Sequence, residues 1–262
     1  MPLNVALAQM AVSLGDQEAN VARAAALAEQ AARAGSELLL LPELWDTGYD
    51  LANWRRYAVP LNEGTFAVMA QLARRHRLAV GGSALEASNG AAYNTFALYG
   101  ADGALLASYR KVHLFGVMEE PRWLLGGQRL QLAQTPWGNV GLAICYDLRF
   151  PEVFRRYALA GARAVFIVAE WPAARALHWR TLLRARAIEN SLFVLGVNRV
   201  GESRGERFAG HSAVVDPWGE LLVEGNDAEA LLTAALDLSA VDAAHARLPV
   251  LSDRRPEVYD VA

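Results

Sequence analysis

Apolar runs of strand length alternate along the chain with longer segments in which apolar residues recur at helical spacing. Leu3–Met10 and Glu37–Leu41 are short apolar runs, and the Ala-rich segment Asp16–Ala34 between them has the spacing of an amphipathic helix. Gly35 is a suitable helix stop, because glycine accepts the left-handed backbone that ends many helices. This alternation predicts strand–helix–strand units and an α/β fold.

The same alternation continues to the last quarter of the chain. Further apolar runs predict strands at Leu78–Ala84, Tyr93–Tyr99, Ala104–Tyr109, Leu130–Gln134, Asn139–Ile144, Ala164–Val168, Ser191–Val197, His211–Val215 and Glu220–Glu224. Helical spacing predicts helices at Thr65–Arg77, Pro151–Ala160 and Arg175–Asn190, with a short helix and an irregular arm after Asp242. The turn sequences predict three hairpins, at Ala101-Asp102-Gly103, Pro136-Trp137-Gly138-Asn139 and Asp216-Pro217-Trp218-Gly219. No linker or low-complexity tract interrupts the pattern, so we predict one domain over residues 1–262.

Two parts of the chain resemble each other faintly. The run that starts at Asn4 is similar to the run that starts at Asn139, and the strand before Glu43 is similar to the strand before Glu170 if one gap is allowed. A pseudo-two-fold arrangement explains this likeness, and so does the shared composition of all strand–helix–strand units. On either reading, Glu43, Cys145 and Glu170 follow apolar strands, at the edge where open α/β sheets bind ligands.

Composition narrows the classes of function. The 262 residues are 53% hydrophobic and 20% charged, which is typical of a globular chain able to bury a core without disulfides or metal. A net charge of −3 provides no global basic field for nucleic acid or anionic lipid. The N-terminus lacks a signal-peptide pattern, no apolar run has membrane-spanning length, and the single cysteine favours a reducing compartment. We therefore expect a cytoplasmic protein with no nucleic-acid or membrane partner.

The single cysteine, Cys145, is the first candidate for chemistry. A free cysteine is usually a small buried apolar residue. Cys145, however, closes an apolar strand a few residues before the predicted helix at Pro151, and a nucleophile on such a turn stands clear of the backbone beside N–H groups that can bind an oxyanion. The thiol still needs a base or a cation to react as thiolate.

Two further residues can supply those groups. Glu43 follows the apolar run Leu38–Leu41 and Pro42, so a carboxylate stands at the end of a buried strand, where it can act as a general base. Lys111 follows the strand Ala104–Tyr109, where its ammonium can stabilise a thiolate and then an oxyanion. Each is also compatible with an ordinary solvated position.

Three sequence blocks together resemble the nitrilase (carbon–nitrogen hydrolase) superfamily. They are Pro42-Glu43 with Thr47-Gly48-Tyr49, the run Tyr109-Arg110-Lys111-Val112-His113-Leu114-Phe115, and the run Cys145-Tyr146-Asp147-Leu148-Arg149-Phe150-Pro151-Glu152. Their order and spacing match the family's, and the likeness extends from Leu3 to Glu257. The resemblance implies a four-layer αββα sandwich that pairs with a second subunit, as a homodimer or a higher homo-oligomer.

The resemblance also assigns roles to individual residues. It implies Cys145 as nucleophile, Glu43 as base and Lys111 as oxyanion partner, with a thioester intermediate and no cofactor. A second family glutamate corresponds to Glu120 or Glu119, and the register from His113 favours Glu120. We predict substrate contacts from the following side chains: Tyr49, Phe115, Tyr146, Glu170, Trp171 and His178. His178 is also compatible with a purely structural role, and the histidine spacing predicts no metal site.

The later motifs favour one branch of that family. Trp171-Pro172, His178-Trp179, the run Arg184–Asn190 and the run Asn198–Gly201 resemble the omega-amidases, which deamidate 2-oxoglutaramate and related monoamides. That branch usually has Asn before Trp-Pro, whereas this chain has Glu170, and a carboxylate there is expected to change the local charge and to repel an anionic substrate. We predict an amidase for the terminal amide of a small acid. An arginine of Arg175–Arg186 can bind the acid group.

Other readings remain open at this stage. Within the family they are a nitrilase, an N-carbamoyl amide hydrolase and an amidase for another small acid. Outside it, a non-catalytic metabolite-binding protein can share the same fold, although the presence of Glu43, Lys111 and Cys145 argues against this.

Overall fold

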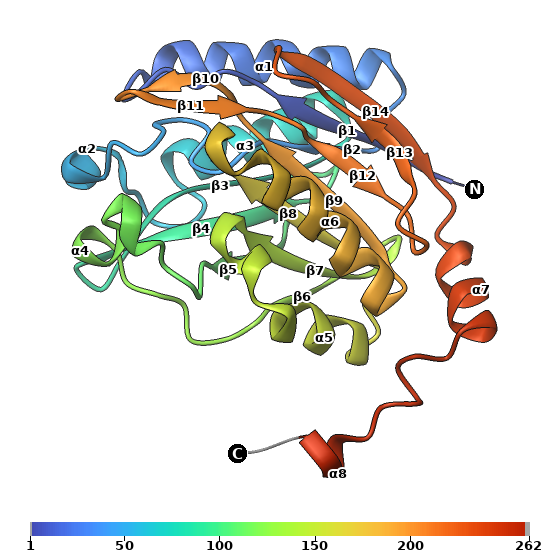
Figure 1. Ribbon diagram of the computed structural model, residues 1–262. Helices are drawn as coiled ribbons and strands as arrows, with labels where there is room; N and C mark the ends of the chain where they lie inside the picture. The colour runs from blue at the N-terminus through green and yellow to red at the C-terminus, as the bar shows by residue number, and fades with distance from the viewer. Residues whose placement is uncertain (1, 260–262) are drawn as a thin grey trace.

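The computed structural model describes residues 2–259 and contains two six-stranded mixed sheets packed face to face (Figure 1). The strands of the first sheet, in spatial order, are β14 (Ala230–Leu236), β1 (Leu3–Gln9), β2 (Leu38–Leu40), β3 (Ala79–Ser88), β4 (Ala91–Tyr99) and β5 (Leu105–Arg110). Those of the second are β13 (Leu221–Glu224), β12 (Ala213–Val215), β9 (Phe193–Asn198), β8 (Ala164–Ala169), β7 (Gly138–Ile144) and β6 (Leu132–Thr135). A small ribbon of β10 (Val200–Ser203) and β11 (Glu206–Ala209) lies beside them.

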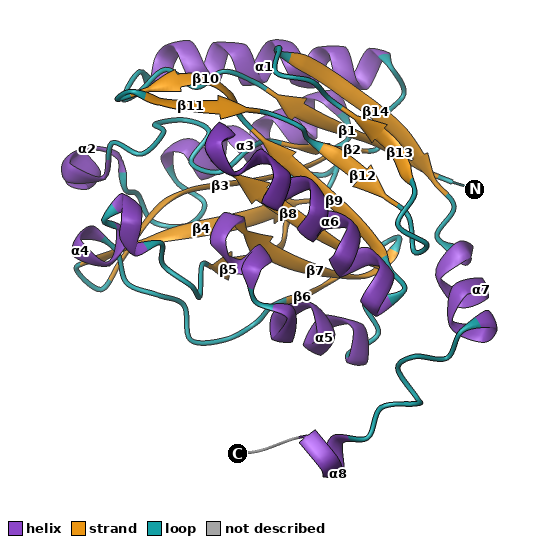
Figure 2. Cartoon of the chain, in the orientation of Figure 1, coloured by secondary structure: helices purple, strands orange, loops and turns teal. Residues whose placement is uncertain are grey.

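Helices cover the outer face of each sheet, which completes four layers in the order α, β, β, α (Figure 2). The helices α1 (Gln17–Arg33) and α3 (Gly64–His76) pack on the first sheet, and α5 (Pro151–Leu159) and α6 (Ala176–Asn190) pack on the second. The predicted αββα sandwich is therefore confirmed. No helix among residues 2–259 combines the length and the apolar character needed to cross a bilayer.

Strand β1 illustrates how alternation builds the layers. Leu3, Val5 and Leu7 belong to the core between the two sheets, whereas Ala6 and Ala8 belong to the core under α1 and α3. Successive side chains of a strand point to opposite faces, so a strand with helices on one side and a sheet on the other is apolar at almost every position.

Short elements surround the loops that follow the strands. They are the helices α2 (Trp54–Tyr57) and α4 (Glu120–Trp123) and the 3₁₀ turns η1 (Leu51–Asn53), η2 (Gly116–Met118), η3 (Cys145–Arg149) and η4 (Ala173–Arg175). After β14 the chain continues through α7 (Ser239–Arg247) to α8 (Pro256–Tyr259), which extends away from the sandwich (Figure 1).

Several elements differ from the prediction. The ribbon β10–β11 and the strand β14, which pairs antiparallel with β1, were not predicted. The hairpin between β3 and β4 was also missed, although Asn89-Gly90 is a strong turn signal, and both residues have positive φ angles, 51° and 77°. The predicted helix Asp16–Ala34 is confirmed as α1, and the Asp16 side chain caps it by accepting from the Ala19 N–H.

Candidate active site

Cys145 stands on a tight turn between β7 and η3. Its φ angle is +45°, a left-handed conformation that costs a non-glycine residue about 1–3 kcal/mol. Asp147 holds this turn, because one carboxylate oxygen accepts from the Ile144 N–H at 2.9 Å and the other accepts from the His113 N–H at 3.1 Å. Asp147 thereby connects the cysteine turn to the segment that follows Lys111, a role that was not predicted from the sequence.

Glu43 lies in the loop that follows β2, and its side chain is completely buried. Its Oε1 atom accepts hydrogen bonds at 2.8 Å from the Tyr49 hydroxyl, the Asn94 amide and the Lys111 ammonium. Its Oε2 atom accepts from the backbone N–H of Glu170 at 2.8 Å. So many donors favour the ionised carboxylate, which is the form a general base needs. Sequence reasoning missed Asn94.

Lys111 follows β5, and its side chain is also completely buried. Its Nζ atom lies 2.8 Å from Glu43 Oε1, 2.7 Å from Glu120 Oε1 and 3.2 Å from the Tyr49 hydroxyl. Burial works against the charged form, but the Glu120 and Glu43 carboxylates outweigh it and raise the pKa of Lys111. The lysine is therefore a fixed cation inside what we call the buried ionic cluster: Glu43, Tyr49, Lys111 and Glu120.

The Cys145 thiol meets this cluster from the second sheet. Burial raises the pKa of the thiol well above its usual value, Glu43 raises it further, and Lys111 opposes the shift. Cys145 therefore rests as a thiol beside a carboxylate that can remove its proton, which is the arrangement for general-base activation rather than for a preformed thiolate.

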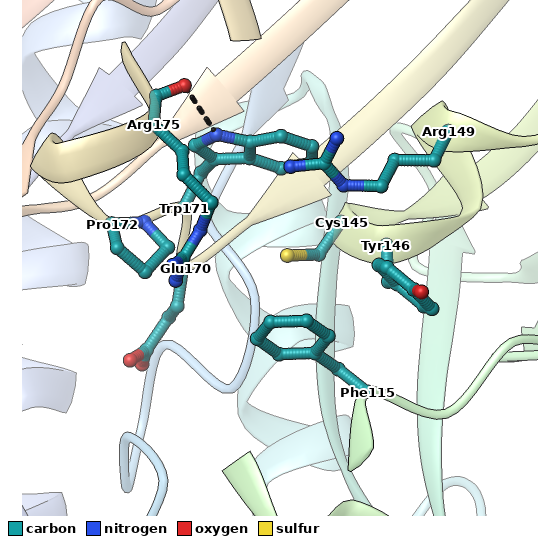
Figure 3. Close-up of a pocket in the computed structure, with 8 residues that line it drawn as sticks. All are labelled: Phe115, Cys145, Tyr146, Arg149, Glu170, Trp171, Pro172 and Arg175. Carbon is teal, nitrogen blue, oxygen red and sulfur yellow. Dashed lines mark hydrogen bonds between the residues drawn. The ribbon is translucent and has the colours of Figure 1, made fainter. Parts of the chain in front are cut away.

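A small pocket opens above the cysteine sulfur and contains about 240 Å³ of empty space, part of it open to solvent (Figure 3). The residues that line it are Phe115, Cys145, Tyr146, Arg149, Glu170, Trp171, Pro172 and Arg175. Four of the six predicted substrate-binding residues are among them.

Tyr49 and His178 do not line the pocket. Tyr49 is buried in the ionic cluster, where its hydroxyl lies 2.8 Å from both Glu43 and Glu120. His178 is exposed on α6 and its Nδ1 atom lies 3.2 Å from an Arg149 nitrogen. The structure therefore gives both residues surroundings other than those we predicted.

Two arginines in the pocket wall rest on aromatic rings. The Arg149 guanidinium lies 4.8 Å from the centre of a Trp171 ring, and that of Arg175 lies 5.6 Å from the centre of the Phe115 ring. Neither takes part in any of the ion pairs found among residues 2–259. We call these two residues the pocket arginines. Arg149 was missed although it stands four positions after Cys145, and Arg175 was predicted only as one of several arginines.

Glu170 does not present a free negative charge to the pocket. Its Oε2 atom lies 3.1 Å from Arg199 Nη1, both side chains are buried, and in Figure 3 its carboxylate extends away from the sulfur. Burial raises the pKa of Glu170 to about 7, although Arg199 opposes this. The expected repulsion of an anionic substrate is therefore reduced, because Arg199 compensates the charge. Arg199 was not identified from the sequence.

The part of the chain that the structure describes contains no cluster of side chains suited to bind a metal ion. Within it, no three or more His, Cys, Asp or Glu side chains are placed to share a metal ion. The polar groups at the site are instead a thiol, carboxylates, an ammonium and guanidinium groups.

Comparison with known proteins adds independent findings. Residues 4–246 match the family model described as carbon–nitrogen hydrolase. The chain is 36% identical to the 2-oxoglutaramate amidase of Bacillus subtilis, over 99% of this chain and 100% of that protein.

Two solved structures are similar as well. One is XC1258 from Xanthomonas campestris, a CN-hydrolase superfamily protein with an arsenic adduct in its active site (TM-score 0.91, 32% identity, 97% of this chain and 98% of that one). The other is an amidase from Nesterenkonia sp. AN1, in which acrylamide has added to the active-site cysteine (TM-score 0.87, 27% identity, 98% of each chain).

Proposed function

Because the chain belongs to the carbon–nitrogen hydrolase family, we propose that it hydrolyses the terminal amide of a small dicarboxylic acid monoamide such as 2-oxoglutaramate. It is a cysteine-dependent amidohydrolase, and the likeness to omega-amidases seen in its sequence agrees with its similarity to 2-oxoglutaramate amidase. The observation that carries the choice of substrate is the pocket itself: its lining contains a thiol and two guanidinium groups that have no carboxylate partner among residues 2–259.

Acylation begins with the Cys145 proton. Glu43 accepts it as the sulfur attacks the amide carbon, and the Lys111 ammonium and the Tyr146 N–H stabilise the developing oxyanion. Loss of one such donor typically costs about 3–4 kcal/mol of transition-state stabilisation. Glu43 then donates the proton to the departing nitrogen, which leaves as ammonia, and a thioester remains on Cys145.

Deacylation uses the same carboxylate. Glu43 removes a proton from water, the hydroxide equivalent attacks the thioester, and the proton returns to the sulfur as the acid departs. In this scheme Glu43 passes one proton forward in each half-reaction, so the cycle closes with the enzyme unchanged. Thiol chemistry suits such a cycle, since sulfur is both a strong nucleophile and a good leaving group.

The pocket arginines give this amidase a preference for acids. The guanidinium group matches a carboxylate with two parallel hydrogen bonds, and an aromatic ring behind it holds it in place without neutralising it. Arg149 and Arg175 both line the pocket that contains the sulfur, so a short chain can place its amide at Cys145 and its far carboxylate at these groups.

An ammonia-release assay tests the proposal. We expect turnover of 2-oxoglutaramate and succinamate, and little turnover of N-carbamoyl-β-alanine or simple nitriles. The Cys145→Ala and Glu43→Gln variants should each release no ammonia, because the first lacks the nucleophile and the second lacks the base, and a mass adduct on Cys145 should be trapped in the wild type during turnover. Turnover by Cys145→Ala, or a preference for nitriles, would contradict the assignment.

We propose further that the enzyme is cytoplasmic, folds as one domain and forms a homodimer or higher homo-oligomer. Leu159 on α5 is 45% exposed, and Leu177 and Ile188 on α6 are 73% and 54% exposed. Contact with a second copy of the chain would remove this apolar surface from water. Light scattering tests the oligomer, limited proteolysis tests the single domain, and cell fractionation tests the location.

A further inference from the structure

The hydroxyl group of Tyr49 lies between two carboxylates. Its oxygen is 2.8 Å from Glu43 Oε1 and 2.8 Å from Glu120 Oε1, and the Lys111 ammonium is 3.2 Å away. A phenol has one proton, so it can donate to only one of these oxygens. If both carboxylates were ionised, the hydroxyl would donate to one of them, and its oxygen would face an oxygen of the other at 2.8 Å with no proton between them.

The net charge of the cluster also indicates that one carboxyl group is protonated. Glu43, Lys111 and Glu120 have completely buried side chains, so two carboxylates and one ammonium would leave one negative charge without a partner. A buried charge without compensation is costly, and such a group commonly takes up a proton instead. One additional proton removes both the lone-pair contact and the excess charge.

The surroundings of the two carboxyl groups decide which one holds that proton. Both oxygens of Glu43 accept from donors, namely Asn94, Lys111 and the backbone N–H of Glu170, in addition to Tyr49. Among residues 2–259, Glu120 has fewer donors: its Oε2 accepts from the Phe115 N–H, and its Oε1 contacts only Lys111 and the Tyr49 hydroxyl. The proton therefore fits on Glu120 Oε1, directed at the Tyr49 oxygen.

We propose that Glu120 rests as a neutral carboxylic acid that donates to Tyr49, while the Tyr49 hydroxyl donates to Glu43. Both residues are then positioning residues, since they act through Glu43 and Lys111 and do not touch the substrate. Burial raises the pKa of Glu120, Lys111 opposes the shift and Glu43 adds to it.

A neutral Glu120 keeps the total charge of the cluster at zero throughout the reaction, an inference that rests on the proposed function. At rest, the cluster with Cys145 as thiol, Glu43 ionised, Lys111 charged and Glu120 neutral has a total charge of zero. In the tetrahedral intermediate Glu43 holds the thiol proton and the oxyanion is negative, so the total is again zero. An ionised Glu120 would add a negative charge beside the oxyanion in every state and weaken its stabilisation by Lys111.

The titratable groups around Tyr49 come from several elements. Glu43 follows β2, Lys111 follows β5, Glu120 begins α4, and Cys145 and Glu170 follow β7 and β8. Apart from the ammonium, these groups and burial all act to raise the pKa of Tyr49 well above its usual value, so the phenol keeps its proton.

Rescue by a matched substitution tests the proposal. In Glu120→Gln the amide nitrogen can take the place of Oε1 and donate to Tyr49, as the proton of a neutral carboxylic acid does, while the amide oxygen accepts from the Phe115 N–H and only the contact with Lys111 is lost. Glu120→Leu can neither donate nor accept. We expect Glu120→Gln to retain kcat within about tenfold of the wild type and Glu120→Leu to lose about 100-fold or more. Equal loss in both variants would overturn the proposal.

The pH profile and the infrared spectrum supply readouts that a merely structural role would not move. The alkaline fall in kcat that Glu120 ionisation causes should disappear in Glu120→Gln. At a pH above the value of about 7 for Glu170, the wild type should show a carboxylic-acid C=O band that is absent in Glu120→Gln. A band that survives the substitution, or no band at all, would overturn the proposal.

Tyr49→Phe provides a second variant that does not depend on the folding of the first. It removes the hydroxyl between the carboxyl groups and should lower kcat while leaving KM almost unchanged. Tyr99→Phe is its control, since the Tyr99 hydroxyl lies 3.1 Å from Asn62, away from the cluster. An unchanged kcat in Tyr49→Phe would contradict the role given to this hydroxyl.

The two proposals can fail separately. A wild type that releases no ammonia from any amide contradicts the proposed function, while the infrared band still reports the protonation of Glu120. An active wild type without that band contradicts only the neutral Glu120.

Discussion

In the buried ionic cluster, every carboxylate oxygen of Glu43 and Glu120 has a donor within 2.8 Å, and the side chains of Glu43, Lys111 and Glu120 have no solvent exposure. The pocket arginines show the opposite arrangement, because Arg149 and Arg175 rest on aromatic rings and form no ion pair among residues 2–259. The charged groups of the cluster are paired with one another. The pocket arginines have no carboxylate partner among the described residues, and a substrate carboxylate can supply one.

This difference separates two tasks. Groups that stabilise a transition state act best when they are fixed and dry before the substrate arrives. Groups that select a substrate gain specificity by remaining unsatisfied until the correct ligand binds. Four measurements test whether the two regions differ in this way.

Replacing Lys111 by Met tests whether the cluster depends on its cation. The change leaves the buried Glu43 carboxylate without its cation, so we expect a loss of about 3–5 kcal/mol of unfolding free energy together with the loss of ammonia release. Denaturant titration measures the first quantity. The control is Arg207→Met, which removes an exposed pair with Asp227 and should cost about 0–1 kcal/mol. Similar losses in both variants would contradict the contrast.

Glu170 is a buried carboxyl group of the pocket lining, and its titration tests how burial changes its pKa. Its pKa rises from 4.5 to about 7 in the folded protein, so the native state holds this proton more tightly than the unfolded chain does. The resulting stability is complete below pH 4.5 and is lost as the pH rises toward 7, by about 3 kcal/mol at 1.36 kcal/mol per unit. The difference in unfolding free energy between the wild type and Glu170→Gln should follow this slope. A difference that is independent of pH would show that the Arg199 pair keeps Glu170 ionised.

The pocket arginines are tested by Arg149→Gln and Arg175→Gln. Each should raise KM for 2-oxoglutaramate by about 10–100-fold, since a hydrogen bond to a charged group contributes about 1.5–3 kcal/mol, while kcat changes little. Butyramide, which lacks a carboxylate, provides the matched control and should be hydrolysed equally by all variants. A fall in kcat for both substrates would place these arginines in the chemical step.

The smallest effect is expected for His178→Ala. The imidazole is exposed on α6 and contacts Arg149 from outside the pocket, so kcat/KM should change by less than about twofold. A steady-state assay with 2-oxoglutaramate measures this. A tenfold loss would show that His178 positions Arg149, and would restore it as a specificity residue.

Much of this site was predictable because it depends on local sequence. Glu43 and Lys111 follow strands of the first sheet and Cys145 follows a strand of the second, and each stands at the carboxyl end of its strand, where α/β sheets bind ligands. Phe115, Tyr146, Glu170 and Trp171 lie within a few residues of those strand ends, and all four line the pocket. The strand β14 was missed because its alanine and leucine pattern suits a helix as well as a strand, and only its pairing with β1 decides between them.

The fold class, the family and the three groups that can carry the reaction could be predicted from the amino-acid sequence, because each depends on residue type, order and periodicity. The partner of each charge depends on the three-dimensional structure: Arg199 for Glu170, Asn94 for Glu43, and an aromatic ring rather than a carboxylate for Arg149 and Arg175. These pairs join segments far apart in the chain or depend on side-chain direction, and the energy of a charge depends on burial and on its neighbours in space.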